Sequence, residues 1–493
     1  MEIFRTKTVE QSIRDTEEPE HQLKRRLSAV DLTVFGIGVI VGTGIFVLTG
    51  RVARDTAGPA VALSFIIAGI VCGLAALCYA EFASTIPVAG SAYTFAFATL
   101  GEFPAWIIGW DLMLEMALAG AVVAVGWSGY FNSLLNTIGV NLPKFEVLGV
   151  EVNYPAMAIV AILTVVLTLG IKLSSRVNLT IVVIKVAVII LVIIAGLFFI
   201  NPTHYTPFIP SPEPTAAVQG LDAPLIQALF GITPVAYGVL GIFSAAAIVF
   251  FAFIGFDIVA TAAEETINPQ RDLPRGIIGS LAICTFLYVA VSLVVVGMQP
   301  YKQLSEDAPL ADAFRAVGQP WIASLISIGA IAGLTTVVMI LMLGQTRVLF
   351  AMCRDGLLPR VLSKVHPKYG TPARITVVVG LVTMLLSGVV SLSELAELVN
   401  IGTLFAFVVV SAGVVILRKT HPELHRAFRT PLVPVLPILS VLACLYLMMN
   451  LPVITWLRFF LWMIIGVAVY FCYGYWHSRV RGWRGSAPKQ PSV

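Results

Sequence analysis

The chain of 493 residues is 58% hydrophobic and only 12% charged, and its mean hydropathy is +0.93. This composition is typical of a membrane protein with many spans and excludes an ordinary soluble domain. The formal net charge of +4 is small, so we expect no nucleic-acid partner.

Twelve apolar segments are long enough to cross a bilayer as helices, which takes roughly 20 residues each. They cover residues 31–53, 59–84, 97–126, 154–171, 177–200, 236–264, 276–298, 321–350, 373–392, 395–417, 433–450 and 454–477. Most lysines and arginines lie before the first span, after every second span and behind the last, which predicts cytoplasmic termini. The longer connections at 127–153, 201–235 and 299–320 are then extracellular. Residues 1–27 are polar and charged, so we expect no cleavable signal peptide.

The first span contains a glycine-rich interruption, Gly42-Thr43-Gly44. Glycine inside a helix costs about 1 kcal/mol relative to alanine, so this sequence favours local unwinding at membrane depth. Unwound backbone cannot face lipid, because its N–H and C=O groups would remain without hydrogen bonds. The interruption therefore predicts a polar cavity in which backbone groups hold a ligand, as in a transporter.

The fifth span carries a lysine, Lys185, among aliphatic residues. A charged side chain at the centre of a membrane helix costs roughly 2.5–3.5 kcal/mol on insertion scales, so we expect Lys185 to face the protein interior. Burial disfavours the charged form of a lysine, which would allow this side chain to exchange a proton. In the alternative, its long stem brings the ammonium to the cytoplasmic interface.

The sixth span contains a second interruption, from Phe251 to Gly255, just before Asp257. If spans one to five and six to ten form two repeats, each interruption lies in the first helix of its repeat. This is the layout of inverted-repeat transporters, whose broken helices meet near the middle of the bilayer. We expect a cytoplasmic tail over 1–28, a transport core over 29–418, two further helices with their preceding loop over 419–478, and a cytoplasmic tail over 479–493.

Several ordered motifs resemble the amino acid–polyamine–organocation (APC) superfamily over about residues 25–420. They are Gly42-Thr43-Gly44-Ile45-Phe46, Tyr79-Ala80-Glu81-Phe82 and Pro87-Val88-Ala89-Gly90-Ser91-Ala92-Tyr93. Three more are similar to its cationic amino acid transporter branch: Gly255-Phe256-Asp257, Glu264-Glu265-Thr266-Ile267-Asn268-Pro269-Gln270-Arg271 and Arg354-Asp355-Gly356-Leu357-Leu358-Pro359.

The resemblance implies an all-α fold of about twelve membrane helices, with a LeuT-like 5+5 inverted repeat in which helices 1 and 6 are broken. It implies secondary active import of cationic or small neutral L-amino acids by proton symport and alternating access. The alternative is an uncoupled facilitator or an exchanger. We expect no enzyme activity, cofactor or metal, and a proton rather than sodium as the coupling ion. The expected setting is the plasma (inner) membrane, as a monomer among lipids, and any accessory subunit is left open.

The same resemblance implies a site for the two charged groups of an amino acid. The N–H groups of Gly42, Thr43 and Gly44 would bind the carboxylate, since the start of a helix carries a positive dipole. The ammonium would be bound by backbone carbonyls from both interruptions, those of Ile40, Phe251, Ala252 and Ile254. Phe251 would also cover the ligand as an aromatic lid. In the alternative, the glycines and Phe251 serve helix packing alone.

Five further residues are candidates for coupling and selectivity. Protonated Lys185 would occupy the place of a sodium ion in related proteins, facing Thr336 of the eighth span. Glu115 would line the pocket or hold water beside the ligand, unless it only bonds a backbone carbonyl. Asp257 would reach a cationic side chain or cap the inner half-helix, and Met339 would set the size of the pocket.

Charged residues on the cytoplasmic side could close an inner gate by ion pairing, or could simply be solvated. They are Glu264, Glu265, Arg271, Arg275 and the run Lys24-Arg25-Arg26.

Overall fold

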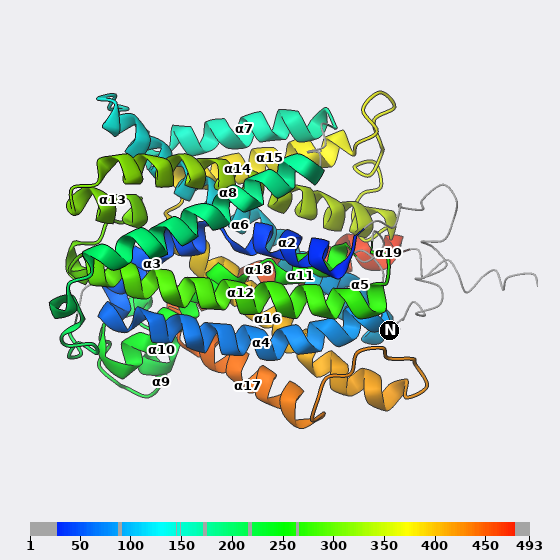
Figure 1. Ribbon diagram of the computed structural model, residues 1–493. Coiled ribbons are helices and arrows are strands. Elements are labelled where there is room, and N and C mark those ends of the chain that lie inside the picture. The colour runs from blue at the N-terminus through cyan, green and yellow to red at the C-terminus, as the bar shows by residue number, and fades with distance from the viewer. Residues whose placement is uncertain are drawn as a thin grey trace, which may run out of the picture.

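A computed structural model describes residues 27–86, 91–143, 145–147, 149–170, 175–214, 219–262 and 266–478. Within these ranges the chain is a bundle of helices (Figure 1). Eight of its helices are long and apolar enough to cross a membrane, and four shorter helices are also apolar. The predicted class, a helical protein with many membrane spans, is therefore confirmed.

The bounds of the helices follow the chain. In the first half they are α2 (Ala29–Ile40), α3 (Thr49–Val52), α4 (Val61–Thr85), α5 (Ser91–Thr99), α6 (Glu102–Thr137), α7 (Tyr154–Thr168), α8 (Ser175–Gly196) and α9 (Leu225–Leu229). In the second half they are α10 (Gly238–Val249), α11 (Phe256–Thr261), α12 (Pro269–Met298), α13 (Pro309–Ala316), α14 (Pro320–Arg354), α15 (Ala373–Val389), α16 (Leu392–Thr420), α17 (Val435–Met449), α18 (Val453–Val469) and α19 (Tyr475–His477).

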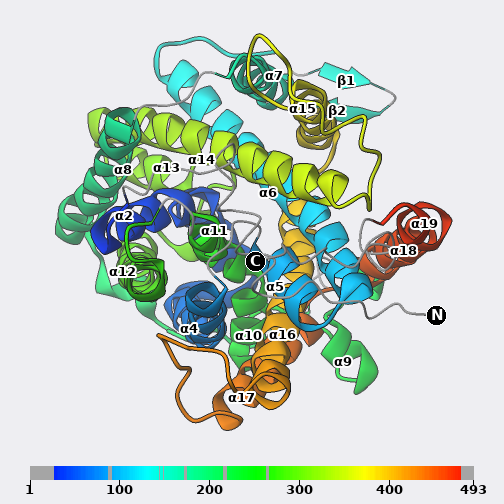
Figure 2. The ribbon, with the colours of Figure 1, turned by 90° about the vertical axis from the view of Figure 1, so that its right-hand side faces the viewer.

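The two longest helices, α6 and α14, pack against each other and form one wall of the interior (Figure 2). At 1.5 Å per residue, the 36 residues of α6 extend for about 54 Å, so this helix continues well beyond a membrane core of roughly 30 Å. On the opposite side, α12 packs against both α2 and α4. The interrupted segments α2–α3 and α10–α11 lie between these walls.

The boundaries of the third span differ from the prediction. We expected one helix over 97–126, but α5 ends at Thr99 and α6 begins at Glu102. The break falls at Gly101, whose φ of +99° is a conformation that glycine adopts readily and other residues rarely adopt. All three predicted connections also contain structure. In the first, α6 continues to Thr137 and is followed by an antiparallel hairpin of β1 (Phe145–Val147) and β2 (Val150–Val152). The second, 201–235, contains α9, and the third, 299–320, contains α13.

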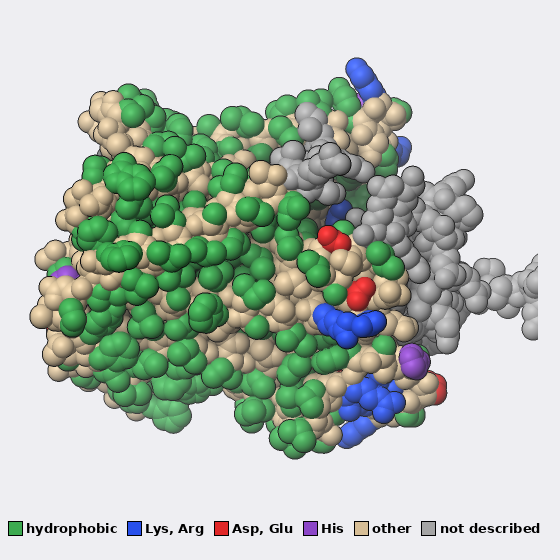
Figure 3. All heavy atoms as spheres, viewed as in Figure 1, with side chains coloured by type: hydrophobic (Ala, Val, Ile, Leu, Met, Phe, Trp, Pro, Cys, Tyr) green, Lys and Arg blue, Asp and Glu red, His purple; other side chains and the backbone are tan. Residues whose placement is uncertain are grey.

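Hydrophobic side chains cover most of the flank of the bundle in Figure 3, as expected for a surface in contact with lipid tails. On this face the acidic and basic side chains gather near the end where the N-terminus lies. Exposed large apolar residues are frequent on α8, α15 and α18, which lie at the periphery.

At one end of α4, Glu81 joins the bundle to the segment between α16 and α17. Its carboxylate accepts hydrogen bonds from the Arg418 guanidinium at 2.9 and 2.7 Å and from the Thr430 N–H at 2.7 Å. Of the predicted gate charges, Glu264, Glu265 and the run 24–26 lie outside the described residues. Arg271 and Arg275 are exposed on α12, and the described part of the chain contains no salt bridge to either.

Candidate functional site

The first interruption begins where α2 ends. Val41 leaves the helix with an extended backbone (φ −72°, ψ 95°), and the chain resumes as a π-helical segment over Gly44–Leu48. Among the described residues, no acceptor is recorded for the N–H groups of Gly42, Thr43 or Gly44. These groups stand at the start of the second half-helix, where the dipole favours a negative charge.

The second interruption exposes carbonyl groups. After α10, residues Phe250–Phe253 form a single 3₁₀ turn, and Ile254 is extended. Gly255 then has a φ of +120°, in the region that favours glycine, and the chain continues as α11. The Phe251 carbonyl accepts a bond from the Ile254 N–H at 3.2 Å, whereas the described residues contain no donor to the carbonyls of Ala252 and Ile254.

The two interruptions fit into each other at two points. A Cβ on Gly44 would overlap Cα and Cβ of Ala252, and a Cβ on Gly255 would lie 2.7 Å from Cγ1 of Val39. Such close backbone approach is possible only for glycine. The free donors of one interruption and the free acceptors of the other are therefore held beside each other.

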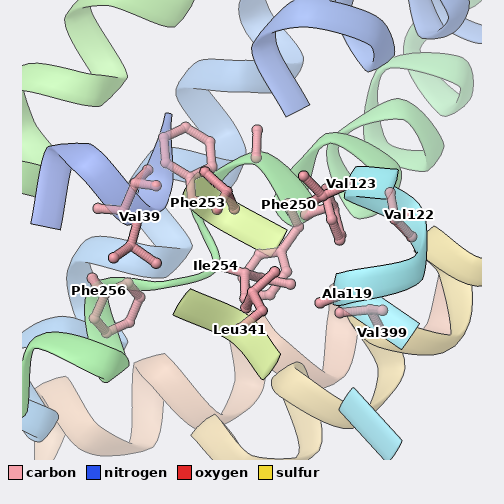
Figure 4. Packing of buried hydrophobic residues seen from close by; sticks show 14 of the residues in the cluster. Val39, Ala119, Val122, Val123, Phe250, Phe253, Ile254, Phe256, Leu341 and Val399 are labelled. Carbon is pink, nitrogen blue, oxygen red and sulfur yellow. The ribbon is translucent and has the colours of Figure 1, made fainter. Parts of the chain in front are cut away.

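A small cavity of about 20 Å³ lies between the interruptions and the wall formed by α6 and α14. It has room for about one water molecule, so a larger ligand would fit only after a wall had moved. Figure 4 shows Ile254 and Leu341 next to each other at this place. The residues that line the cavity are Val39, Ile40, Gly42, Thr43, Gly44, Ala119, Val123, Phe251, Ile254, Val337 and Leu341.

Lys185 of α8 is completely buried and does not reach the interface. Its ammonium donates hydrogen bonds to the carbonyls of Gly38 at 2.5 Å and Val41 at 3.2 Å. These carbonyls lack helical partners because α2 ends here, and the C-terminal end of a helix attracts positive charge. The stem of Lys185 crosses α14 at Gly333, where a Cβ would lie only 2.6 Å away.

Not every residue predicted for the site lines the cavity. Ile40 does, but its carbonyl already accepts a bond from the Tyr288 hydroxyl at 2.8 Å. Ala252 contributes to the site through its contact with Gly44 rather than as part of the cavity wall. The Thr336 hydroxyl donates to the Gly333 carbonyl of its own helix at 2.8 Å.

The predicted acidic residues and Met339 do not line the cavity. Glu115 and Asp257 are buried without lining the cavity, and Asp257 Oδ1 accepts a bond from the Gly255 N–H at 3.2 Å. Met339 is buried, but Val337 and Leu341 are the residues of α14 that face the cavity.

The sequence interpretation missed the apolar walls. They consist of Val39, Ala119, Val123, Val337 and Leu341. The sequence did contain one indication of the α6 residues that line the cavity. Ala119 and Val123 follow the predicted site residue Glu115 at intervals of four, so they share its helix face.

The sequence matches the family model described as "Amino acid permease" over residues 27–470. It is 49% identical to the branched-chain amino acid permease BcaP of Bacillus subtilis, over 97% of this chain and 99% of the relative. It is 46% identical to the methylthioribose transporter of the same organism, over 97% and 98% of the two chains. With the vacuolar cationic amino acid transporter 4 of Arabidopsis thaliana it shares 38% identity, over 82% of this chain and 65% of the relative.

These relatives are permeases and transporters, so the expectation of a transporter rather than an enzyme is confirmed. The family model covers nearly all of the described residues, including both interruptions and Lys185. The chain is a membrane protein and belongs to the amino acid permease family, within the APC superfamily.

Proposed function

We propose that this permease imports amino acids by proton symport, with α2–α3 and α10–α11 as the broken first helices of a LeuT-like 5+5 inverted repeat. The observation that carries the proposal is the contact between the two interruptions. It places free N–H donors at Gly42–Gly44 beside free carbonyls at Ala252 and Ile254. An amino acid presents the complementary pair, a carboxylate and an ammonium at a fixed separation.

The walls favour substrates with small or branched aliphatic side chains. The side chains of Ala119, Val123, Val337 and Leu341 are apolar, and they would leave a cationic group without a partner. The name of the relative with 49% identity, a branched-chain amino acid permease, agrees with this substrate class.

Cationic amino acids are a second candidate, which the buried Glu115 favours. Glu115 is buried on α6, one helical turn before Ala119, which lines the cavity. A longer cationic side chain would reach Glu115 only if the wall of the cavity moved. Several relatives with lower identity are named cationic amino acid transporters.

Proton coupling would act through Lys185. Its protonated form ties α8 to the end of α2, next to the carboxylate-binding groups. Loss of the proton removes a charge-assisted bond from each carbonyl, which frees the first interruption to move and release the substrate inward. The ammonium fills the place that sodium would otherwise occupy, so no sodium dependence is expected.

Access from outside would be controlled by Phe251. Its side chain is buried and lines the cavity, and Ile248, one turn earlier, lines a larger cavity farther out. We assign the protein to the plasma (inner) membrane as a monomer among lipids, with residues 1–28 and 479–493 in the cytoplasm.

Uptake by the purified full chain in proteoliposomes tests this proposal. With an imposed pH gradient, we expect accumulation of L-leucine, L-valine or L-alanine above equilibrium, independent of sodium. Equilibration without accumulation would show a facilitator, and uptake only against a preloaded amino acid would show an exchanger. Either result would refute proton symport, and accumulation of lysine and arginine alone would refute the aliphatic preference.

A further inference from the structure

A second cavity, of about 260 Å³, lies at the end of the bundle away from the N-terminus, between α3, α10, α16 and the start of α18. We call it the outer cavity. It is roughly ten times larger than the central one and is lined by charged and polar side chains as well as apolar ones. Its volume is sufficient for a small organic molecule, and the proposed function gives it no role.

The arginines of the outer cavity already have partners. Arg458 of α18 forms a salt bridge with Glu394 of α16 at 2.8 Å. Arg51 of α3 donates to the Ser393 hydroxyl at 3.2 Å and lies 4.0 Å from the Asp55 carboxylate. Each positive charge in the wall is thus matched by a neighbouring acid, so the cavity offers little to an anionic ligand.

Two further carboxylates line the outer cavity. They are Glu397 of α16, which accepts a hydrogen bond from the Thr455 hydroxyl at 3.0 Å, and Asp222. Within the described part of the chain, neither forms a salt bridge. The acids in the wall therefore outnumber the bases, and the excess is located at these two groups.

Two buried polar atoms in the same wall also have no hydrogen-bond partner among the described residues. Asn450 is 3% exposed, and its Oδ1 has no hydrogen bond while its Nδ2 donates to the Tyr446 carbonyl. The hydroxyl of Ser244, which is 7% exposed, is also unpaired. A buried polar atom without a partner costs about 1–3 kcal/mol. Asn450 Oδ1 can only accept, and the Ser244 hydroxyl can also accept, so both are available to a ligand that donates hydrogen bonds.

We propose that the outer cavity binds an organic cation through an ammonium or guanidinium group. Glu397 and Asp222 would supply the charge, and Asn450 Oδ1 would accept one of the N–H bonds. A metal ion fits less well, because the described residues contain no group of acidic, histidine or cysteine side chains close enough to hold one. This inference does not depend on the substrate of the central cavity.

The position of the outer cavity connects it to the central site. Ile248 lines it, and Phe251 of the central cavity follows three residues later in the same segment. At 1.5 Å per residue this is a separation of about 5 Å along the segment. A cation held here would lie on the path that an external substrate takes toward Phe251.

Binding of cadaverine to the purified full chain tests the inference. This diamine lacks a carboxylate, so it cannot use the N–H groups of the central site. We expect saturable binding by calorimetry and about tenfold weaker binding in Glu397→Gln, since a charge-assisted hydrogen bond is lost. The glutamine can still accept the Thr455 bond. Asp222→Asn should also weaken binding. Because Asp222 is exposed, this second variant tests the site even if Glu397→Gln fails to fold.

Glu213→Gln is the matched control, because Glu213 is an exposed acid that pairs with Lys302 in a loop away from the outer cavity. It should leave cadaverine binding unchanged. The inference is overturned if the unmodified protein does not bind cadaverine, or if Glu397→Gln and Asp222→Asn bind it as tightly as the unmodified protein does.

The source of the cation is resolved by transport in the same variants. If the ligand is the ammonium of an incoming amino acid, Glu397→Gln raises the KM for uptake by about the factor lost in cadaverine binding. If it is a separate amine, amino acid uptake without amine is unchanged in Glu397→Gln, and cadaverine alters uptake only in the unmodified protein. Both results are consistent with a cation site in the outer cavity. The absence of any proton-driven uptake would refute the proposed function but not this site.

Discussion

Replacement of Lys185 by methionine separates proton coupling from substrate binding. Methionine keeps an unbranched stem against Gly333 but removes the ammonium that bonds the carbonyls of Gly38 and Val41. Two hydrogen bonds from a charged donor contribute roughly 3–6 kcal/mol together. Even the lower value changes the equilibrium constant between conformations that make these bonds and conformations that do not by about 100-fold.

The assay is accumulation of labelled L-leucine in proteoliposomes with the membrane potential clamped at zero. A gradient of about one pH unit stores 1.36 kcal/mol and sustains about tenfold accumulation with one proton per substrate. We expect the unmodified protein to approach this ratio and Lys185→Met to reach equilibration only. Exchange against preloaded leucine should persist in the variant, because the groups at Gly42–Gly44 and Ala252 are intact.

The control is Lys302→Met, which removes an exposed lysine that pairs with Glu213. Exposed pairs contribute about 0–1 kcal/mol, so coupling should be unchanged. The reasoning is refuted if Lys185→Met accumulates leucine to the same ratio as the unmodified protein. Melting temperature is a poor substitute for this assay, because removal of a buried charge also removes the cost of burying it.

Three other substitutions test separate parts of the structure. Gly255→Ala places a side chain at φ +120° against Val39, a strain of about 1–3 kcal/mol, and should abolish uptake while gel filtration still shows folded protein. Leu341→Ala enlarges the central cavity and should raise the relative affinity for longer side chains, measured by competition; an unchanged ranking would exclude Leu341 from the pocket. Glu81→Gln removes the carboxylate that pairs with Arg418 and should lower the free energy of unfolding by about 2 kcal/mol, which is measured as a lower melting temperature; an unchanged melting temperature would contradict this.

The interruptions could be located from sequence because glycines inside an apolar span weaken the helix and favour local unwinding. Gly42, Gly44 and Gly255 all lie within spans, where unwinding has a large cost unless it forms a cavity. Their direct contact was not predictable, since nothing in the local sequence indicates that Gly44 would meet Ala252 and Gly255 would meet Val39.

The apolar walls were harder to predict for a geometric reason. Successive residues of an α-helix point about 100° apart, so choosing Met339 instead of Val337 or Leu341 requires the rotation of α14. The sequence of α14 is apolar on all sides and carries no signal of that rotation. The location of the Lys185 side chain was easier to predict, because a lone charge in an apolar span indicates burial against protein.

The boundary between α5 and α6 shows a different limit. The stretch from Ser91 to Thr137 is rich in helix-forming residues, and only the positive φ at Gly101 separates its two helices. A single glycine in such a stretch is compatible with a continuous helix or with a break, so the sequence pattern alone did not distinguish them.

The central claim, that the two interruptions hold the carboxylate and the ammonium of an amino acid, is tested most directly by ligand analogues. Thermal stabilisation of the purified protein can be compared for L-valine, valinamide, which lacks the carboxylate, and isovalerate, which lacks the ammonium. The structure predicts stabilisation by L-valine alone, and no stabilisation of Gly44→Ala, whose Cβ would overlap Ala252. Equal stabilisation by valinamide or isovalerate would contradict the claim.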